Sequence, residues 1–116
     1  MLNQVILVGR LTKNPEIKET ESGKKMTYIN IAVQRPFKNV DGIYETDFIS
    51  CVLWNNIAEN TVEYTKCGDV IGIKGRIQTD RYQDEEGNMN YTTEIIAEKI
   101  TFLSSSKSTD DDNKQQ

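Results

Sequence analysis

Apolar residues recur at every second position along much of this chain, a pattern that predicts half-buried β-strands. Two long strands are expected at residues 26–35 and 46–54, separated by a loop at residues 37–43 that contains an Asp-Gly turn signal. The inward rows are Ile29, Ile31 and Val33 in the first strand and Ile49, Cys51 and Leu53 in the second. Two aromatic residues, Phe48 and Trp54, fall on the opposite face of the second strand. The alternation thus separates a core row from an aromatic face.

Three further segments carry strand patterns: a short one around Ile17 and longer ones at residues 70–83 and 91–103. Residues 70–83 are expected to form an inward and an outward row if no bulge intervenes. The inward row is Ile71, Ile73 and Ile77, and the outward row is Lys74, Arg76 and Tyr82. Gly72 and Gly75 suit the bends that close a barrel.

One short helix is expected between the second long strand and residue 70. Asn56 is a suitable N-cap, Glu59 three residues later completes a box-like pattern, and Gly68 is suited to end the helix. The stripe at helical spacing is Ile57, Thr61, Tyr64 and Thr65. We expect this stripe to lie against one end of the strands.

The first strand differs from the others because residues 5–8, Val-Ile-Leu-Val, are apolar without interruption. Such a strand needs cover on both faces. Cover can come from elsewhere in its own domain or from a second copy of the chain. We predict a homo-oligomer built through this strand, with its interface at Leu2, Gln4, Ile6 and Val8.

The order of the long elements is three strands, a helix and two strands. This order is expected of an OB-fold, an all-β, five-stranded Greek-key barrel with one short helix between strands 3 and 4. The domain would span residues 1–103, and the polar, acidic residues 104–116 would form a disordered tail. A chain of 116 residues suits one such domain.

The composition argues against a metal site and against generic binding of polyanions. The chain contains no histidine, and its two cysteines, Cys51 and Cys67, lack the spacing of a metal site, so no metal or cofactor is expected. Reduced, buried thiols are favoured over a disulfide. No segment has the length and apolarity of a membrane span, and a soluble cytoplasmic protein is expected. Fourteen basic and 18 acidic residues give a net charge of −4, the wrong sign for a generic polyanion binder.

Five segments resemble the bacterial single-stranded DNA-binding protein family, in that family's order and nearly its spacing. The segments are residues 1–11, 14–16, 31–37, 47–54 and 75–82. The resemblance covers nearly all of residues 1–103. It implies an OB-fold subunit and a homotetramer around which DNA wraps. It also implies sequence-tolerant binding of single-stranded DNA in replication, recombination, repair or DNA uptake, near the nucleoid.

Binding of single-stranded DNA requires aromatic rings that face solvent, because unpaired bases stack on flat rings. Phe48 and Trp54 qualify by strand parity, and Phe37 and Tyr82 also match base-stacking positions of the family. Packing of the same rings into the core is the alternative. Parity and resemblance together indicate cations for phosphate contacts, with Arg76 and Arg35 first, followed by Lys74, Arg81, Arg10 and Lys13. Plain solvated surface is the alternative for each of them.

The chain departs from the family in charge and in its tail. Asp80 and Cys67 stand where relatives commonly carry a basic residue, which predicts a shallower salt dependence than that of a strongly basic relative. The tail has an acidic run but lacks the apolar tip with which longer members dock on partner proteins. We therefore expect poor binding of such partners, as in an accessory member used in DNA uptake, a phage or a mobile element, or in a truncated chain.

Two other function classes are compatible with the pattern. A hydrolase could hold Mg²⁺ at Asp80, Asp84 and Glu85, but these acids lie in an expected hairpin turn with no base or nucleophile beside them. An OB-fold could instead bind structured RNA or serve only as a protein-interaction module. The sequence favours a binding protein and not an enzyme.

Overall fold

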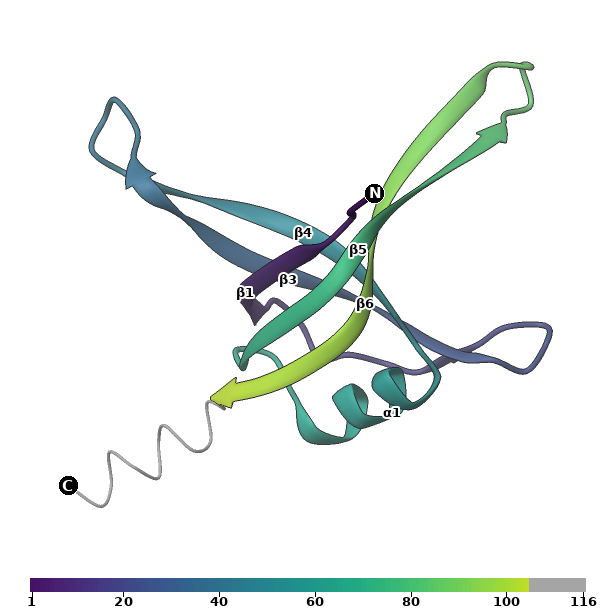
Figure 1. Cartoon of the computed structure of the whole chain (residues 1–116), viewed down its shortest axis with the longest axis horizontal. Coiled ribbons are helices and arrows are strands. Elements are labelled where there is room, and N and C mark those ends of the chain that lie inside the picture. Colours follow the sequence, from purple (N-terminus) through teal and green to yellow (C-terminus); the bar gives the residue numbers. More distant parts are fainter. Residues whose placement is uncertain (105–116) are drawn as a thin grey trace.

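Six strands and one helix follow one another in residues 1–104, the part of the chain that the computed structural model describes (Figure 1). The elements are β1 (Val5–Leu11), β2 (Lys18–Glu19), β3 (Lys25–Lys38), β4 (Tyr44–Trp54), α1 (Asn55–Tyr64), β5 (Val70–Gln83) and β6 (Met89–Ser104). The strand predicted at residues 70–83 is confirmed at both ends. The other long strands extend beyond the predicted bounds. Residues 105–116 of the predicted tail lie outside the described residues.

The five long strands close into a barrel because β1 pairs with strands on both of its sides. Val5 to Arg10 pair antiparallel with β5, and Arg10 and Leu11 pair antiparallel with β3. The remaining order is β5, β6, β4, β3, with a parallel contact between β4 and β6. This closed barrel is the predicted OB-fold. The helix follows the third long strand, but the two-residue β2 places it between β4 and β5 in the full count.

The barrel interior is filled by the aliphatic rows that the alternation predicted. Ile31, Cys51, Leu53 and Ile71 are 0% exposed, and Ile29 and Ile73 are 2% exposed. These residues form one continuous core cluster. Burying each such side chain contributes about 1.5–3 kcal/mol to the folding free energy before entropy is subtracted. The inward rows of β3 and β4 are therefore confirmed and form the main stabilising core.

The helix differs from its prediction at both ends and on its buried face. It begins at Asn55, so Asn56 does not cap it, and its N-cap Trp54 makes no side-chain capping hydrogen bond. Glu59 instead forms an ion pair with Lys25, with 2.9 Å between Nζ and Oε1. The helix ends at Tyr64, and Gly68, at φ +93°, lies in the turn that leads to β5. No helix in residues 1–104 is long and apolar enough to cross a membrane.

Ala58 and Thr61 form the buried face of the helix, with Ile57 half-buried beside them. Tyr64, which was predicted to belong to this face, is 63% exposed. The small side chain of Ala58 lets the helix approach the barrel closely, so the contact is centred on Ala58 and Thr61, and Tyr64 lies beyond its edge. Its ring instead lies 6.2 Å from the ring of Phe102 on β6.

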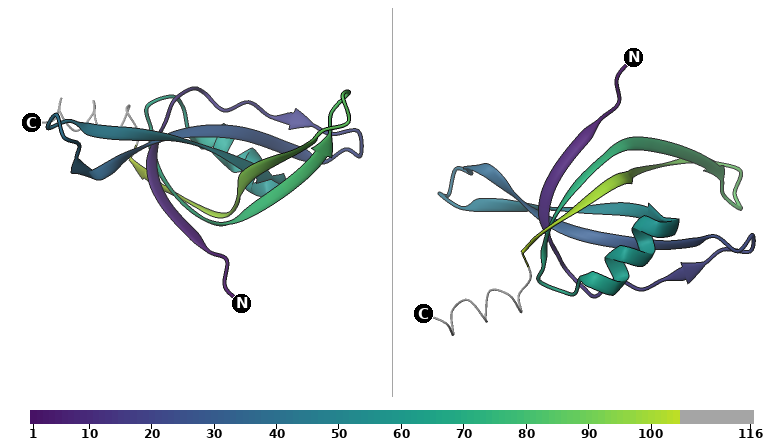
Figure 2. Two further views of the ribbon diagram at one scale, coloured as in Figure 1. Left: turned by 90° about the horizontal axis from the view of Figure 1, so that it is seen from above. Right: turned by 60° about the horizontal axis from the view of Figure 1, so that its bottom comes forward.

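Two hairpins, β3–β4 and β5–β6, continue past the barrel as diverging arms (Figures 1 and 2). Residues 79–83 of β5 are all exposed, as expected for a two-stranded ribbon without a core. Ile77, predicted to face the core, is 43% exposed. It keeps the parity of Ile71 and Ile73, but it lies where the strand leaves the barrel. The prediction for Ile77 is therefore wrong because parity does not say where the core ends.

The two thiols have different environments, although both were predicted to be buried. Cys51 is in the core, and burial raises the pKa of its thiol to about 11. Cys67 is exposed in the turn after the helix, where its thiol donates a hydrogen bond to the carbonyl oxygen of Thr12. The loss of burial follows from the early end of the helix, which places Cys67 in a surface turn.

This difference predicts selective thiol reactivity. In the folded protein, Cys67 should react rapidly with a disulfide reagent such as Ellman's reagent, whereas Cys51 should react only after unfolding. A Cys67→Ser variant should then show almost no fast phase. Two equally fast thiols in the folded wild-type protein would contradict the buried position of Cys51.

Candidate nucleic-acid interface

Phe48 and Trp54 lie on the outer face of β4, and neither ring enters the barrel. Phe48 stands opposite Ala32 of β3 and is 67% exposed. Trp54 is half-buried and packs on a small outer cluster of Met26, Val52 and Ile96. The two rings are six residues apart on the same face of the strand, so each offers a separate flat surface on which a base can stack. Phe48 is therefore not packed in the core, and Trp54 is only partly buried.

Tyr28 belongs to the same face, although its sequence position did not predict a binding role. It stands opposite Val52, one position diagonal to Trp54, and is 44% exposed. Strand parity puts Tyr28 on the outer side of β3, because it alternates with Ile29 and Ile31 of the inward row. What the sequence could not supply was the register that puts it beside Trp54. The outer face of β3 and β4 therefore carries Tyr28, Phe48 and Trp54, and parity along β4 places Tyr44 there as well.

Phe37 and Tyr82 lie on different arms of the molecule. Phe37 is 62% exposed near the end of β3, which runs to Lys38 and so includes part of the predicted loop. The strand passes through an irregularity between Gln34 and Lys38, where Pro36 is tolerated because the ladder is already interrupted. Tyr82 is 55% exposed near the tip of the β5–β6 arm. These two rings extend the aromatic surface away from the barrel.

Arg76 lies next to the outer cluster on which Trp54 packs. The register aligns Arg76 with Ile96, while Ile96 belongs to the cluster under Trp54. Its guanidinium donates a hydrogen bond of 2.8 Å to Oε1 of Gln78, and Nε lies 4.0 Å from the Glu98 carboxylate. The long ion-pair distance leaves most of the guanidinium donors available to another acceptor.

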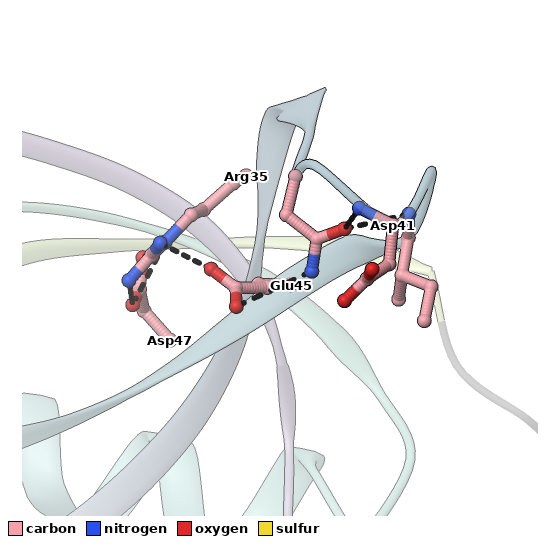
Figure 3. A network of polar contacts seen from close by, with 6 residues as sticks. Arg35, Asp41, Glu45 and Asp47 are labelled. Carbon is pink, nitrogen blue, oxygen red and sulfur yellow. Dashed lines mark hydrogen bonds and ion pairs between the residues drawn. The ribbon is translucent and has the colours of Figure 1, made fainter.

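Arg35 is in a different electrostatic state, because two carboxylates of β4 hold its guanidinium (Figure 3). Nη2 donates to Oδ1 of Asp47 at 2.9 Å, Nε donates to Oδ2 at 3.1 Å, and Nη1 donates to Glu45. These hydrogen bonds from Arg35 lower the pKa of the Asp47 carboxyl below its ordinary value. Arg35 thus joins β3 to β4 at the base of the arm and is not a free cation.

The remaining predicted cations do not form one group. Lys13 is exposed beside a hollow near Tyr28, and Arg10 donates a hydrogen bond of 2.6 Å to the carbonyl oxygen of Gly68. Lys74 pairs with Ile6 and lines the apolar hollow beside β1. Arg81 is exposed, but its parity puts it on the face of β5 opposite Arg76 and Tyr82.

The acidic residues of the β5–β6 arm organise the turn. Asp84 Oδ1 accepts hydrogen bonds from the backbone N–H groups of Asn88 and Glu86, and Oδ2 accepts one from the Asn90 amide. The hydrogen bond from the Asn88 backbone is the main reason that the pKa of the Asp84 carboxyl is lowered. Within residues 1–104, no group of three His, Cys, Asp or Glu side chains is arranged to hold a metal ion. Asp84 therefore has a structural role in this turn.

The outer face of β1 is apolar, and nothing in residues 1–104 covers it. Ile6 and Val8 are 71% and 54% exposed, and Leu2 is 87% exposed. Together with Gly72 and Leu103, Ile6 and Val8 line a shallow hollow of about 310 Å³. The alternative of cover within the same domain is thus wrong for this face of residues 5–8.

The comparisons with known proteins agree with this architecture. A family model described as "Single-strand binding protein family" matches residues 2–103. Single-stranded DNA-binding protein B of Bacillus subtilis is 46% identical over 103 residues, which are 89% of this chain and 91% of that protein. The single-stranded DNA-binding protein of Oceanobacillus iheyensis is 47% identical over 103 residues, 89% of this chain and 64% of that protein.

Single-stranded DNA-binding protein 3 of Listeria innocua is 48% identical over 105 residues, which are 90% of this chain and 66% of that protein. The matched part of the chain thus spans slightly less than two thirds of the Oceanobacillus and Listeria proteins, but most of the Bacillus protein. The family match covers the whole barrel, including every strand that carries an outer aromatic ring. This chain belongs to the single-strand binding protein family.

Proposed function

We propose that this chain binds single-stranded DNA without sequence preference by stacking bases on exposed rings. The observation that carries the proposal is the position of Phe48 and Trp54 on one outer face of β4, accessible to solvent and held by a rigid barrel. Every base has a flat π-face, so such rings bind unpaired bases of any sequence, with about 1–3 kcal/mol per stacked base. Phe37 and Tyr82 are proposed to stack further bases along the two arms.

The fluorescence of Trp54 provides a direct test of this proposal, because Trp54 is the one tryptophan of the chain. Addition of oligo(dT) should quench this fluorescence, and an excess of duplex DNA or folded RNA should not reverse the quenching. Reversal by folded RNA would select an RNA-binding OB-fold instead. Absence of binding, measured in parallel by anisotropy of a labelled oligonucleotide, would select a protein-interaction module.

We propose that phosphate contacts come first from Arg76, which lies next to the cluster under Trp54 and has most of its donors available. Arg35 was predicted to rank with Arg76. To reach a phosphate it would have to leave Asp47 and Glu45, so we rank it lower. Lys74, Arg81, Arg10 and Lys13 complete the proposed set of cations.

This ranking predicts different salt dependences for two matched variants. Arg76→Gln should reduce the slope of log K against log salt concentration by about 0.7, the value for one phosphate contact on a single strand. Arg35→Gln should change this slope less, because its charge is already compensated by two carboxylates. Titrations at four or more salt concentrations measure both slopes. An equal or larger loss for Arg35→Gln would contradict the ranking.

The acidic balance of the chain leads to a separate expectation for the wild-type protein. Asp80 and the turn acids Asp84, Glu85 and Glu86 are close to the predicted contacts of the β5–β6 arm. Their negative charges repel phosphate, so few phosphate contacts are expected on the β5–β6 arm. We therefore expect a shallower salt slope than that of a strongly basic member of the family, measured under identical conditions. An equally steep slope would contradict this expectation.

We propose a homotetramer in which the outer face of β1 forms one interface through Leu2, Gln4, Ile6 and Val8. The apolar hollow beside Ile6 and Val8 supports this proposal, because exposed apolar surface of this kind is stabilised by burial against another copy. Ile6→Glu should lower the mass measured by light scattering. Ile43→Glu, a control at a 59% exposed isoleucine of the β3–β4 turn, should leave the mass unchanged.

The biological setting follows from the same proposal. We infer a non-enzymatic protein without a cofactor that protects single-stranded DNA in the cytoplasm, near the nucleoid, during replication, recombination, repair or DNA uptake. The family relationship supports this inference. Partner proteins are proposed to bind poorly through residues 104–116. Pull-down of replication or repair proteins through these residues would contradict that part.

A further inference from the structure

A hollow of about 340 Å³ lies next to the aromatic face, between the segment after β1 and strand β3. Its lining residues are Lys13, Asn14, Glu16, Lys18 and Tyr28. A volume near the lower end of the range of small-ligand sites suits one flat group of the size of a nucleobase. The hollow is therefore large enough to be considered as part of the binding surface.

Hydrogen bonds from distant parts of the chain hold the wall of this hollow in place. The Thr27 hydroxyl donates a hydrogen bond of 2.7 Å to the carbonyl oxygen of Glu16. The backbone N–H of Cys67 donates one of 2.7 Å to Oδ1 of Asn14. Because β3 and the turn after α1 both fix the segment, the hollow is preformed and does not depend on a ligand for its shape.

Tyr28 connects this hollow to the rings on β4. It is 44% exposed and stands one position diagonal to Trp54 on the neighbouring strand. Diagonal residues of paired strands are about 7–8 Å apart, a distance that aromatic side chains can bridge. A strand of DNA that leaves Trp54 in this direction meets the Tyr28 ring next.

The charges around the ring favour a phosphate. Lys18 Nζ lies 5.8 Å from the centre of the Tyr28 ring, and Lys13 lines the same hollow. Glu16 is the one acid among the lining residues, so two ammonium groups face one carboxylate there. The flexible stem of Lys18 lets its ammonium group move from the ring to a phosphate when a base occupies the ring.

We propose that this hollow is an additional nucleotide subsite, in which a base stacks on Tyr28 and the adjoining phosphate contacts Lys13 and Lys18. The inference rests on the proposed binding of single-stranded DNA, and it specifies the direction that the DNA strand takes after Trp54. From Trp54 the strand crosses β3 toward the segment at residues 13–18 instead of following β4 alone. In this arrangement, the phosphate that Lys13 contacts belongs to the nucleotide stacked on Tyr28.

Matched variants at Tyr28 test the subsite. Tyr28→Ala should weaken binding of a long oligo(dT) about five- to 150-fold and shorten the strand covered per protomer by about one nucleotide. Tyr28→Phe keeps the ring and should bind like the wild type. Lys18→Gln should lower the salt slope by about 0.7. Thermal unfolding of each variant shows that the barrel is retained, and Lys18, being exposed, provides the test if Tyr28→Ala does not fold.

Photochemical crosslinking locates the base directly. An oligo(dT) carrying 5-iododeoxyuridine should crosslink to the peptide that contains Tyr28 in the wild-type protein, and the crosslink should disappear in Tyr28→Ala. If the wild type binds oligo(dT) but the Tyr28 and Lys18 variants keep its affinity, covered length and salt slope, the subsite is overturned. If the wild type itself does not bind oligo(dT), the proposed function fails instead.

Discussion

Replacing Phe48 by alanine is expected to weaken binding of oligo(dT) by about 1–3 kcal/mol, or about five- to 150-fold, with little change in stability. The ring is 67% exposed on the outer face of β4, so few core contacts are lost with it. The lost free energy is the stacking of one base on an exposed flat surface. Fluorescence anisotropy of a labelled oligonucleotide measures the affinity, and thermal unfolding measures the stability.

Two further substitutions separate stacking from simple apolar contact. Phe48→Tyr keeps a flat ring and should bind nearly as tightly as the wild type. Phe48→Leu keeps apolar volume without the ring and should resemble Phe48→Ala. Trp54→Ala should also weaken binding, but it should lower stability as well, because Trp54 packs on Met26, Val52 and Ile96. Full affinity in Phe48→Ala would remove Phe48 from the proposed interface.

Replacing Gly75 by alanine is expected to lower the free energy of unfolding by about 3 kcal/mol or more, or to prevent the barrel from forming. Gly75 pairs with Val5 of β1 on one side and with Ala97 of β6 on the other. A Cβ atom there would lie 2.2 Å from the carbonyl oxygen of Ile96 and 3.1 Å from Cα of Ala97. Both neighbours are backbone atoms, so relief requires movement of β6 itself.

Gly72 of the same strand provides a matched control for Gly75. Its added Cβ would meet Leu103 Cδ1 at 3.6 Å and Thr101 Cβ at 3.7 Å, which are ordinary contacts. Gly72→Ala should therefore change the free energy of unfolding by no more than about 1 kcal/mol. Chemical denaturation of both variants tests the pair. Equal stability of the two would show that β6 adapts to the added methyl group.

The prediction of the fold succeeded where local periodicity is decisive. The inward rows of β3 and β4 follow from a period of two, which any strand with one buried face must show. The same argument failed for Ile77, because it lies beyond the end of the barrel, and for Tyr64, because the small Ala58 centres the helix contact elsewhere. The end of a core depends on how far neighbouring strands extend, and that is a property of the assembled sheet.

The candidate site, like the fold, was predicted from the sequence only in part. Parity and resemblance identified Phe48 and Trp54 as outer rings, but the pairing register was needed to place Tyr28 beside Trp54. Arg35 looked like a free cation in the sequence, since Asp47 lies twelve residues away and Glu45 lies ten residues away. The β3–β4 pairing brings both carboxylates to the guanidinium. Charge compensation across strands therefore needs the three-dimensional contacts.

Short-range spacing was enough to predict the inner aliphatic rows, the outer position of two rings and the apolar character of the first strand, and the order of elements predicted the barrel class. The folded structure was needed to show which rings are neighbours, which cations are already paired and where a hollow forms beside Tyr28. Those features arise from residues far apart in the chain. Only strand register and barrel closure bring them together.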